Sequence, residues 1–371
     1  MKTFITIALL VLSSHYTFSE DEDSFPKTDL NQDGYAIATP DVKLVFPRDH
    51  GSHPDFKTEW WYITGHLESP GQDHRYGFQI TFFRSSLKPT TNEQIYMAHA
   101  ALIDKATGRF AHEERLNSDQ WNAAAKVGAL DLYNGNWFLR MLDPDTEEMA
   151  TRFSLSEIGS FNLNLKPEKP KTLFGDRGYS KKGDAFGAAS HYITFTRLAV
   201  SGTAQINGET VPLSGHAWMD HEFSSSQLSE EQIGWNWTSL ILDDGSELMA
   251  YVMRRNDGEV DPNSRLTLIA ADGMKSEYTG DSFSWEPIRH WTSPQTSGRY
   301  PVEYRVSWVS NRNVKRSLIV RPSADDQELR GKIGDFVYWE GAGQAFDEAG
   351  KPIGLAYTEL TGYTESLYGK F

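Results

Sequence analysis

The sequence predicts an all-β protein in which two antiparallel barrels or sandwiches follow one another along the chain. The first observation is strict alternation: in residues 75–82, Tyr76, Phe78 and Ile80 share one face of a strand, while polar residues and glycine share the other. The second is a series of Asn-Gly and Asp-Gly pairs, which favour tight hairpin turns. The third is the length of 371 residues, which exceeds what one hydrophobic core usually fills, so that two domains are expected.

Strands with one buried face recur along the whole chain. They are expected at residues 75–82, 96–103, 136–142, 192–199, 235–242, 248–254, 265–271, 304–309, 317–321 and 354–362. Hairpin turns are expected at Asn134-Gly135, Asn207-Gly208, Asp244-Gly245, Asp257-Gly258 and Asp272-Gly273. Helical patterns are rare, and the best is a short window at residues 118–127. Parallel α/β folds are therefore disfavoured, because parallel strands need a helical crossover.

The first 19 residues are predicted to form a secretory signal peptide. Lys2 is followed by an apolar run at residues 4–12, and small and polar residues then lead to a cleavage site after Ser19. This run is much shorter than the roughly 20 residues of a membrane span, and no other window approaches one. We therefore expect a periplasmic or secreted protein without an integral membrane span.

The rest of the chain is divided into three parts. Residues 20–35 are acidic and polar, which is typical of a flexible leader. The polar stretch at residues 224–232 separates two strand-rich regions. We therefore predict one barrel domain at residues 36–226 and a second at residues 227–371.

The composition excludes several kinds of site. Without cysteine there is no disulfide, zinc ribbon, iron–sulfur cluster or thiolate nucleophile. A net charge of −15 makes nucleic acid an unlikely partner, because its phosphates need an excess of Lys and Arg. Phosphate-binding loops and serine nucleophile elbows are absent from the sequence, and Gly341-x-Gly343 lacks the third glycine of a dinucleotide loop. No organic cofactor is expected.

The densest group of ionisable residues lies at residues 215–222. In an extended strand, four of them would share one face: His216, Trp218, Asp220 and Glu222. Repulsion from Glu222 would raise the pKa of Asp220, which suits a general acid near neutral pH. The alternatives are a solvated strand end and a metal site. Alternation separates the metal ligands onto two faces, and no metal is expected.

Aromatic segments are candidates for the wall of a ligand pocket. Trp60 and Tyr62 would share one face of a strand, and Glu59 and Trp61 the other. Consecutive tryptophans require that a core or a pocket covers at least one face. Core packing is the alternative interpretation. Residues 338–343 and 358–363 each bring a glutamate among aromatic residues in the same way.

Five motifs resemble those of the AttH and carotenoid 1,2-hydratase-like family, in the same order and over almost the whole mature chain. They lie at residues 59–67, 78–84, 215–222 and 234–237, and at 338–341 together with 359–363. The resemblance implies two consecutive lipocalin-like β-barrels. It also implies that His216, Trp218 and Asp220 correspond to the acid–base region of the hydratases.

The favoured function is a cofactor-free hydro-lyase that adds water to a carbon–carbon double bond of an apolar, isoprenoid or lipid-like ligand. Asp220 would protonate the alkene and His216 would take a proton from the attacking water. Trp218 with Trp235 or Trp237 would stabilise the cation, and Glu59, Trp60 and Tyr62 complete the candidate ligand-binding set. One alternative is a non-catalytic carrier beside an ABC-type export system, as the resemblance to AttH allows. Another is a carbohydrate-active protein with Asp220 and Glu222 as its carboxylate pair.

Overall fold

A computed structural model describes residues 25–26, 28–71, 75–91, 93–226, 228–310, 313–333 and 336–369. The predicted signal peptide at residues 1–19 and the beginning of the predicted leader lie outside these ranges. In the described parts, helix is limited to two short 3-10 turns, η1 (Arg48–His50) and η2 (Gly280–Ser282). None of the described segments forms a helix with the length and apolar character needed to cross a membrane.

The first sheet runs from β1 to β13 and is antiparallel. Its strands are β1 (Thr58–Glu68), β2 (Arg75–Ser86), β3 (Gln94–Asp104), β4 (Arg109–Ser118), β5 (Ala123–Ala125), β6 (Asp131–Asn134), β7 (Trp137–Asp143), β8 (Glu148–Leu155), β9 (Gly159–Pro167), β10 (Thr172–Leu173), β11 (Tyr179–Lys181), β12 (Ala189–Ile206) and β13 (Glu209–Ser226). The last strand, β13, returns to pair with the first, β1. This pairing curls the sheet into a nearly closed barrel.

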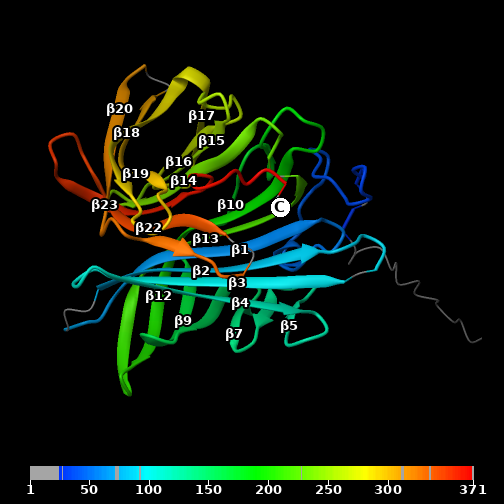
Figure 1. Cartoon of the computed structure of the whole chain (residues 1–371), viewed down its shortest axis with the longest axis horizontal. Helices are drawn as coiled ribbons and strands as arrows, with labels where there is room; N and C mark the ends of the chain where they lie inside the picture. The colour runs from blue at the N-terminus through cyan, green and yellow to red at the C-terminus, as the bar shows by residue number, and fades with distance from the viewer. Residues whose placement is uncertain are drawn as a thin grey trace, which may run out of the picture.

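The second sheet repeats the arrangement with β14 to β23. Its strands are β14 (Gln232–Leu242), β15 (Glu247–Arg255), β16 (Arg265–Ile269), β17 (Lys275–Thr279), β18 (Phe283–Thr292), β19 (Arg299–Val309), β20 (Lys315–Pro322), β21 (Glu328–Arg330), β22 (Val337–Phe346) and β23 (Pro352–Leu360). Here too the first strand, β14, pairs with the last, β23. The two sheets form separate lobes, with the C-terminal strands in yellow to red above the N-terminal strands in blue to green (Figure 1).

This architecture confirms the predicted all-β fold of two lipocalin-like barrels, and every predicted strand overlaps an observed one. The turn at Asn207-Gly208 joins β12 to β13 with φ angles of 53° and 83°, the left-handed values that these residue types tolerate. The predicted helical window at residues 118–127 is wrong, because this segment contains a turn and the short strand β5. Whether residues 36–226 and 227–371 are independent domains stays a prediction.

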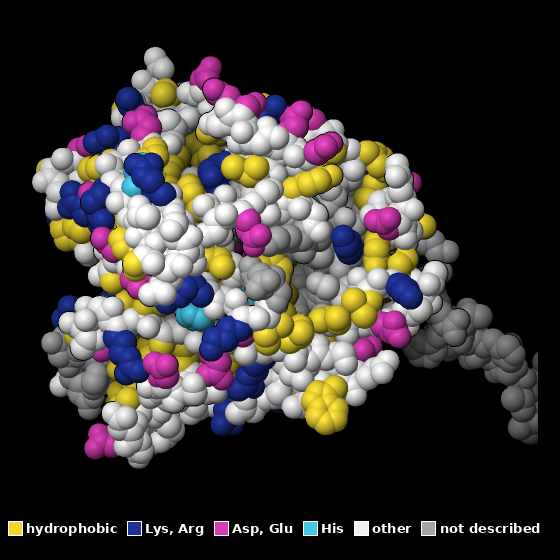
Figure 2. All heavy atoms as spheres, in the orientation of Figure 1, with side chains coloured by type: hydrophobic (Ala, Val, Ile, Leu, Met, Phe, Trp, Pro, Cys, Tyr) yellow, Lys and Arg dark blue, Asp and Glu magenta, His cyan; other side chains and the backbone are white. Residues whose placement is uncertain are grey.

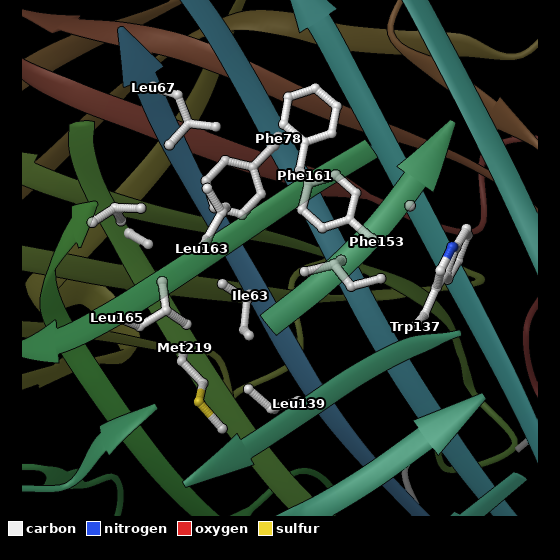
Figure 3. Close-up of a cluster of buried hydrophobic side chains, with 14 of the residues drawn as sticks. Ile63, Leu67, Phe78, Trp137, Leu139, Phe153, Phe161, Leu163, Leu165 and Met219 are labelled. Atoms are coloured by element: carbon white, nitrogen blue, oxygen red, sulfur yellow. The ribbon is translucent and has the colours of Figure 1, made fainter. Parts of the chain in front are cut away.

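Apolar side chains occupy the interior of the first barrel. Ile63 from β1, Phe78 from β2 and Met219 from β13 meet Phe153 and Phe161 from the opposite strands (Figure 3). A second apolar cluster, around Leu240, Tyr304 and Leu318, lies among the strands of the second sheet. Alternation explains both clusters, because every second residue of a strand points to the same side.

The other faces of the central strands meet between the barrels. A third cluster joins Tyr62, Tyr192 and Trp218 of the first sheet to Trp237 and Tyr251 of the second. Tyr62 and Trp237 pack edge to face, with ring centroids 5.2 Å apart. Both faces of these strands are therefore buried, one in a barrel and one between barrels.

The close approach of β2 and β22 predicts a clash at Gly77. A Cβ atom at this position would lie 2.1 Å from Cβ of Ala342 in the other barrel. Gly77→Ala is expected to lower the unfolding free energy by about 1–3 kcal/mol, because this contact cannot accept another methyl group. Adding Ala342→Gly should restore most of the loss in urea unfolding. A double variant no more stable than Gly77→Ala would contradict the steric explanation.

Candidate functional site

A cavity lies between the two barrels. It contains about 910 Å³ of empty space, part of it open to solvent. The first sheet contributes side chains from β1, β2, β3, β12 and β13, and the second contributes side chains from β14, β15, β22 and β23. Aromatic and methionine side chains form much of the wall, and two threonines, one histidine, one lysine and three carboxylates stand among them. In the space-filling view, basic side chains and histidine gather where the two lobes meet (Figure 2).

Asp220 of β13 lines this cavity and is almost completely buried. Its Oδ1 atom accepts hydrogen bonds from Thr194 Oγ1 at 2.7 Å and Trp218 Nε1 at 2.8 Å, and its Oδ2 accepts one from Tyr192 Oη at 2.6 Å. Burial outweighs these bonds and, with the charge of Glu222, raises the pKa of Asp220 to about 7. The carboxyl group is therefore divided between acid and carboxylate at neutral pH.

Glu222 lies two residues along the same strand and has a cation as partner. Its Oε2 atom is 2.8 Å from Nζ of Lys182 and also accepts a hydrogen bond from Ser190 Oγ. Lys182 is itself buried, and its ammonium lies 4.5 Å from the ring centroids of Tyr192 and Tyr251. The lysine and Glu222 thus form a compact ion pair in the cavity wall.

Glu359 of β23 brings a second titrating carboxyl group from the other barrel. Its Oε2 atom accepts a hydrogen bond from Trp235 Nε1 at 2.7 Å. Burial, together with the charges of Glu222 and Asp220, raises the pKa of Glu359 to about 7. Both barrels therefore present to one cavity a carboxyl group that can exchange protons near neutral pH.

A third carboxyl group, that of Glu340, is buried next to Glu359 but does not line the cavity. Glu340 of β22 faces Glu359 directly across the strand pair and accepts a hydrogen bond from Tyr62 Oη at 2.9 Å. Burial and the neighbouring charge of Glu359 raise the pKa of Glu340 well above its usual value. Glu340 therefore keeps its proton to a higher pH than an ordinary glutamate does.

Among the described residues, one imidazole lines the cavity, that of His99 on β3. Its Nδ1 atom is 2.7 Å from the hydroxyl of Tyr338 on β22. Burial, and then the charge of His112, lower the pKa of His99 to about 3, so that the ring is neutral at pH 7. It can therefore donate one hydrogen bond and accept another.

The structure gathers six of the predicted site residues around the cavity: Trp60, Tyr62, Asp220, Glu222, Trp235 and Trp237. Trp218 supports Asp220 through its indole N–H. The roles assigned to these residues stay predictions. Sequence reasoning missed Tyr192, Lys182 and His99. It placed Glu359 in an aromatic segment at residues 358–363 but left it out of the candidate site residues.

His216 lies outside the set of residues that line the cavity. It pairs with His66 across β1 and β13, and its Nε2 atom is 3.5 Å from a carboxylate oxygen of Glu168. Its side chain is 42% exposed, whereas that of Asp220 is buried. The alternation places His216 on the expected face, but the long strand β13 carries it beyond the cavity.

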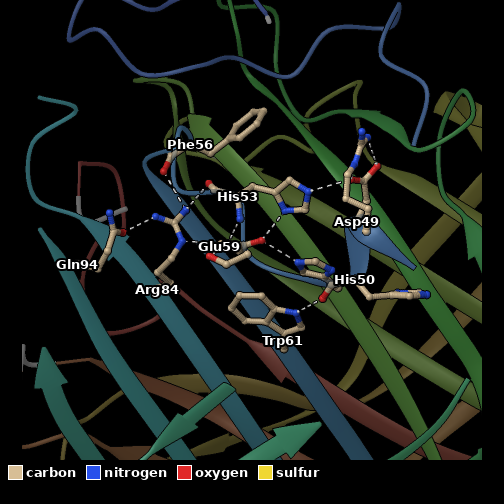
Figure 4. Close-up of polar contacts among 11 residues, drawn as sticks. Asp49, His50, His53, Phe56, Glu59, Trp61, Arg84 and Gln94 are labelled. Atoms are coloured by element: carbon tan, nitrogen blue, oxygen red, sulfur yellow. Dashed lines mark hydrogen bonds and ion pairs between the residues drawn. The ribbon is translucent and has the colours of Figure 1, made fainter. Parts of the chain in front are cut away.

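Glu59 lies on the other face of β1 from Trp60 and Tyr62, where a buried polar network surrounds it (Figure 4). Arg84 Nε donates to its Oε2 atom at 2.9 Å, and His53 Nδ1 and His221 Nε2 lie 2.8 and 2.9 Å from its Oε1 atom. Burial raises the pKa of Glu59, but the charges and hydrogen bonds of these three partners outweigh it and hold that pKa well below its usual value. The network ties η1 and the following loop to β1, β2 and β13.

Three side chains of this network, those of His53, Glu59 and His221, have the composition of a small metal site. Ligand atoms of His53, Glu59 and His221 lie within 4.8 Å of one another. Two of them already approach Glu59 at hydrogen-bond distance, and the Arg84 guanidinium would face the metal with a positive charge. The positive charge of Arg84 already balances Glu59, so that these residues favour a hydrogen-bonded network over a bound metal ion.

The raised pKa of Glu359 predicts a stability that depends on pH. The folded state holds this proton up to about pH 7, above the usual value of 4.5, so that ionisation costs stability as the pH rises through this window. Glu359→Gln should therefore stabilise the protein by about 1–3 kcal/mol more at pH 8 than at pH 5. Urea unfolding at both pH values measures the difference. The exposed Glu209→Gln is the control, and the same change at both pH values for Glu359→Gln would refute the shift.

The comparisons with known proteins agree on one family. A family model described as AttH-like matches residues 37–363. A crystal structure assigned as AttH from Nitrosomonas europaea is 37% identical, with a TM-score of 0.79 over 88% of this chain and 99% of that chain. A search of curated proteins found no match to this chain.

Two other solved structures share the fold at low identity. Kievitone hydratase from Nectria haematococca is 13% identical, with a TM-score of 0.66 over 92% of this chain and 98% of that chain. CghA with Sch210972 is 11% identical, with a TM-score of 0.56 over 90% of this chain and 98% of that chain. The family model and the identity to the Nitrosomonas protein go beyond likeness of fold. The chain therefore belongs to the AttH-like family.

Proposed function

We propose that the cavity between the barrels binds an apolar small molecule and adds water to one of its carbon–carbon double bonds. One observation supports this most: two carboxyl groups with pKa values of about 7 line one aromatic cavity. An acid in this range can both give and regain a proton at neutral pH. The name of kievitone hydratase, which shares the fold, is consistent with this chemistry.

The reaction begins with Asp220. Its carboxyl proton is transferred to one alkene carbon, the π electrons form the new C–H bond, and the other carbon becomes a cation. The indole rings of Trp60, Trp235 and Trp237 and the ionised form of Glu359 are placed to stabilise this positive charge. Water then forms the C–O bond and releases a proton, and Asp220 regains its own proton from solvent.

The cavity wall favours an apolar ligand over a sugar. A sugar needs polar partners for many hydroxyl groups, whereas aromatic and methionine side chains form much of this surface. Binding without turnover in the same cavity is the carrier hypothesis, and export with an ABC-type partner stays a prediction.

The test combines ligand identification with a turnover assay. Mass spectrometry of the protein purified from its native host should detect an apolar compound. Geraniol, farnesol and squalene are then incubated with the protein in ¹⁸O-labelled water. The proposal expects at least one alcohol that carries a single ¹⁸O atom. A retained compound with no labelled product from any alkene would support the carrier hypothesis and refute the hydratase.

A further inference from the structure

We propose that His99 and Glu114 hold the attacking water molecule and that Glu114 accepts its proton. The proposal rests on the proposed function for the reaction itself, but the water site can be tested without turnover. Its basis is a pair of buried polar atoms that have no hydrogen-bond partner among the described residues, Nε2 of His99 and Oε2 of Glu114. They lie 4.0 Å apart.

A distance of 4.0 Å is too long for a direct hydrogen bond between these atoms, but it suits a bridging oxygen. A water molecule placed to one side of the line between them can be within about 2.8 Å of both atoms. Buried polar atoms without partners are rare in folded proteins, and ordered water is a common reason for an apparent exception. Since His99 lines the cavity, this water would lie at the edge of the ligand space.

The hydrogen bonds around His99 define which group donates. Burial and nearby carboxylates keep the pKa of the Tyr338 hydroxyl well above its usual value, so that it stays protonated. The proposal takes the Tyr338 O–H as the donor to Nδ1 of His99, which places the imidazole proton on Nε2. His99 then donates to the water oxygen and leaves the water protons to point elsewhere.

Glu114 is held in position to receive one of these protons. Its Oε1 atom accepts hydrogen bonds from the backbone N–H groups of Lys332 and Ile333, the second at 2.9 Å. Its Oε2 atom is directed toward His99 and accepts no hydrogen bond from the described residues. The sequence of donors is therefore Tyr338 to His99, His99 to water, and water to Glu114.

This arrangement supplies a held water molecule for the C–O bond and an acceptor for the proton that this water releases. When the cation forms, a lone pair of the held water makes the C–O bond. The resulting oxonium is far more acidic than a carboxylic acid, so that its proton passes to Oε2 of Glu114 without a strong base. His99 is a positioning residue, and Glu114 is the base in place of the half-exposed His216.

A high-resolution crystal structure tests the water site directly. The proposal expects an ordered water within about 3.2 Å of both atoms. His99→Leu should lose this water, whereas His112→Leu, on neighbouring β4, should keep it. A direct bond between His99 and Glu114, or a His99→Leu structure that retains the water, would overturn the proposal.

A deuterium experiment tests the role of Glu114 in the reaction, with farnesol as the probe. In Glu114→Gln, Asp220 can still protonate the alkene, but the amide does not take the proton of the oxonium, so that the C–O bond breaks again and the cation returns to alkene. Hydration should fall about 100-fold, while deuterium from D₂O still enters the recovered alkene. Equal loss of hydration and exchange would overturn the role of Glu114. Absence of both in the wild type would refute the proposed function instead and leave the crystallographic result unaffected.

Discussion

Replacing Arg84 by methionine is expected to lower the free energy of unfolding by about 3–5 kcal/mol. Arg84 is 1% exposed and bonds to the Glu59 carboxylate at 2.9 Å. It also donates to Gln94 Oε1 and to the carbonyl oxygens of His53 and Phe56. Methionine fills part of the space but leaves a buried negative charge and several acceptors without this cation.

The control for this variant is an exposed ion pair of the same chemical type. Arg109 and Glu157 form a bond of 2.9 Å, but their side chains are 56% and 70% exposed. Arg109→Met should therefore change the stability by less than about 1 kcal/mol. Urea unfolding followed by tryptophan fluorescence compares the two variants. If both substitutions cost the same, the buried network contributes no more than a surface pair.

Replacing Asp220 by asparagine is expected to reduce alkene hydration by about 100-fold or more. Asparagine keeps the size of the side chain and can still accept bonds from Thr194 and Trp218, so that the cavity keeps its shape. What it loses is the proton that a carboxyl group with a pKa of about 7 supplies. Binding of the alkene, measured by calorimetry, should change little.

His216→Gln tests whether His216 is the base, as the sequence predicted, or lies too far from the cavity to take part, as its place in the structure indicates. The imidazole is 42% exposed and pairs with Glu168, so that its loss is expected to change the hydration rate by less than about threefold. A His216→Gln variant as inactive as Asp220→Asn would restore the catalytic imidazole to residue 216.

A pH profile of the wild type should also show activity falling as the pH rises above 7, where Asp220 loses its proton.

The faces of the strands were predictable because alternation is a local property. It placed Trp60 and Tyr62 on one face of their strand and Glu59 and Trp61 on the other face. The structure shows the same division. Met219, the chain neighbour of Asp220, lies on the opposite face of β13, inside the first barrel. A resemblance of five ordered motifs then indicated the two-barrel fold correctly.

The sequence by itself therefore determined the all-β class, ten of the strands, the hairpin turn at Asn207-Gly208 and the face of β13 that carries Asp220 and Glu222. Only the tertiary structure decided that the cavity lies between the barrels, that Glu359 faces it with Asp220, and that His99 and not His216 is its imidazole. The physical reason is that alternation has a period of two residues and gives no position along a strand. Where a side chain ends up along the 18-residue strand β13 depends on the pairing of sheets that are distant in the sequence.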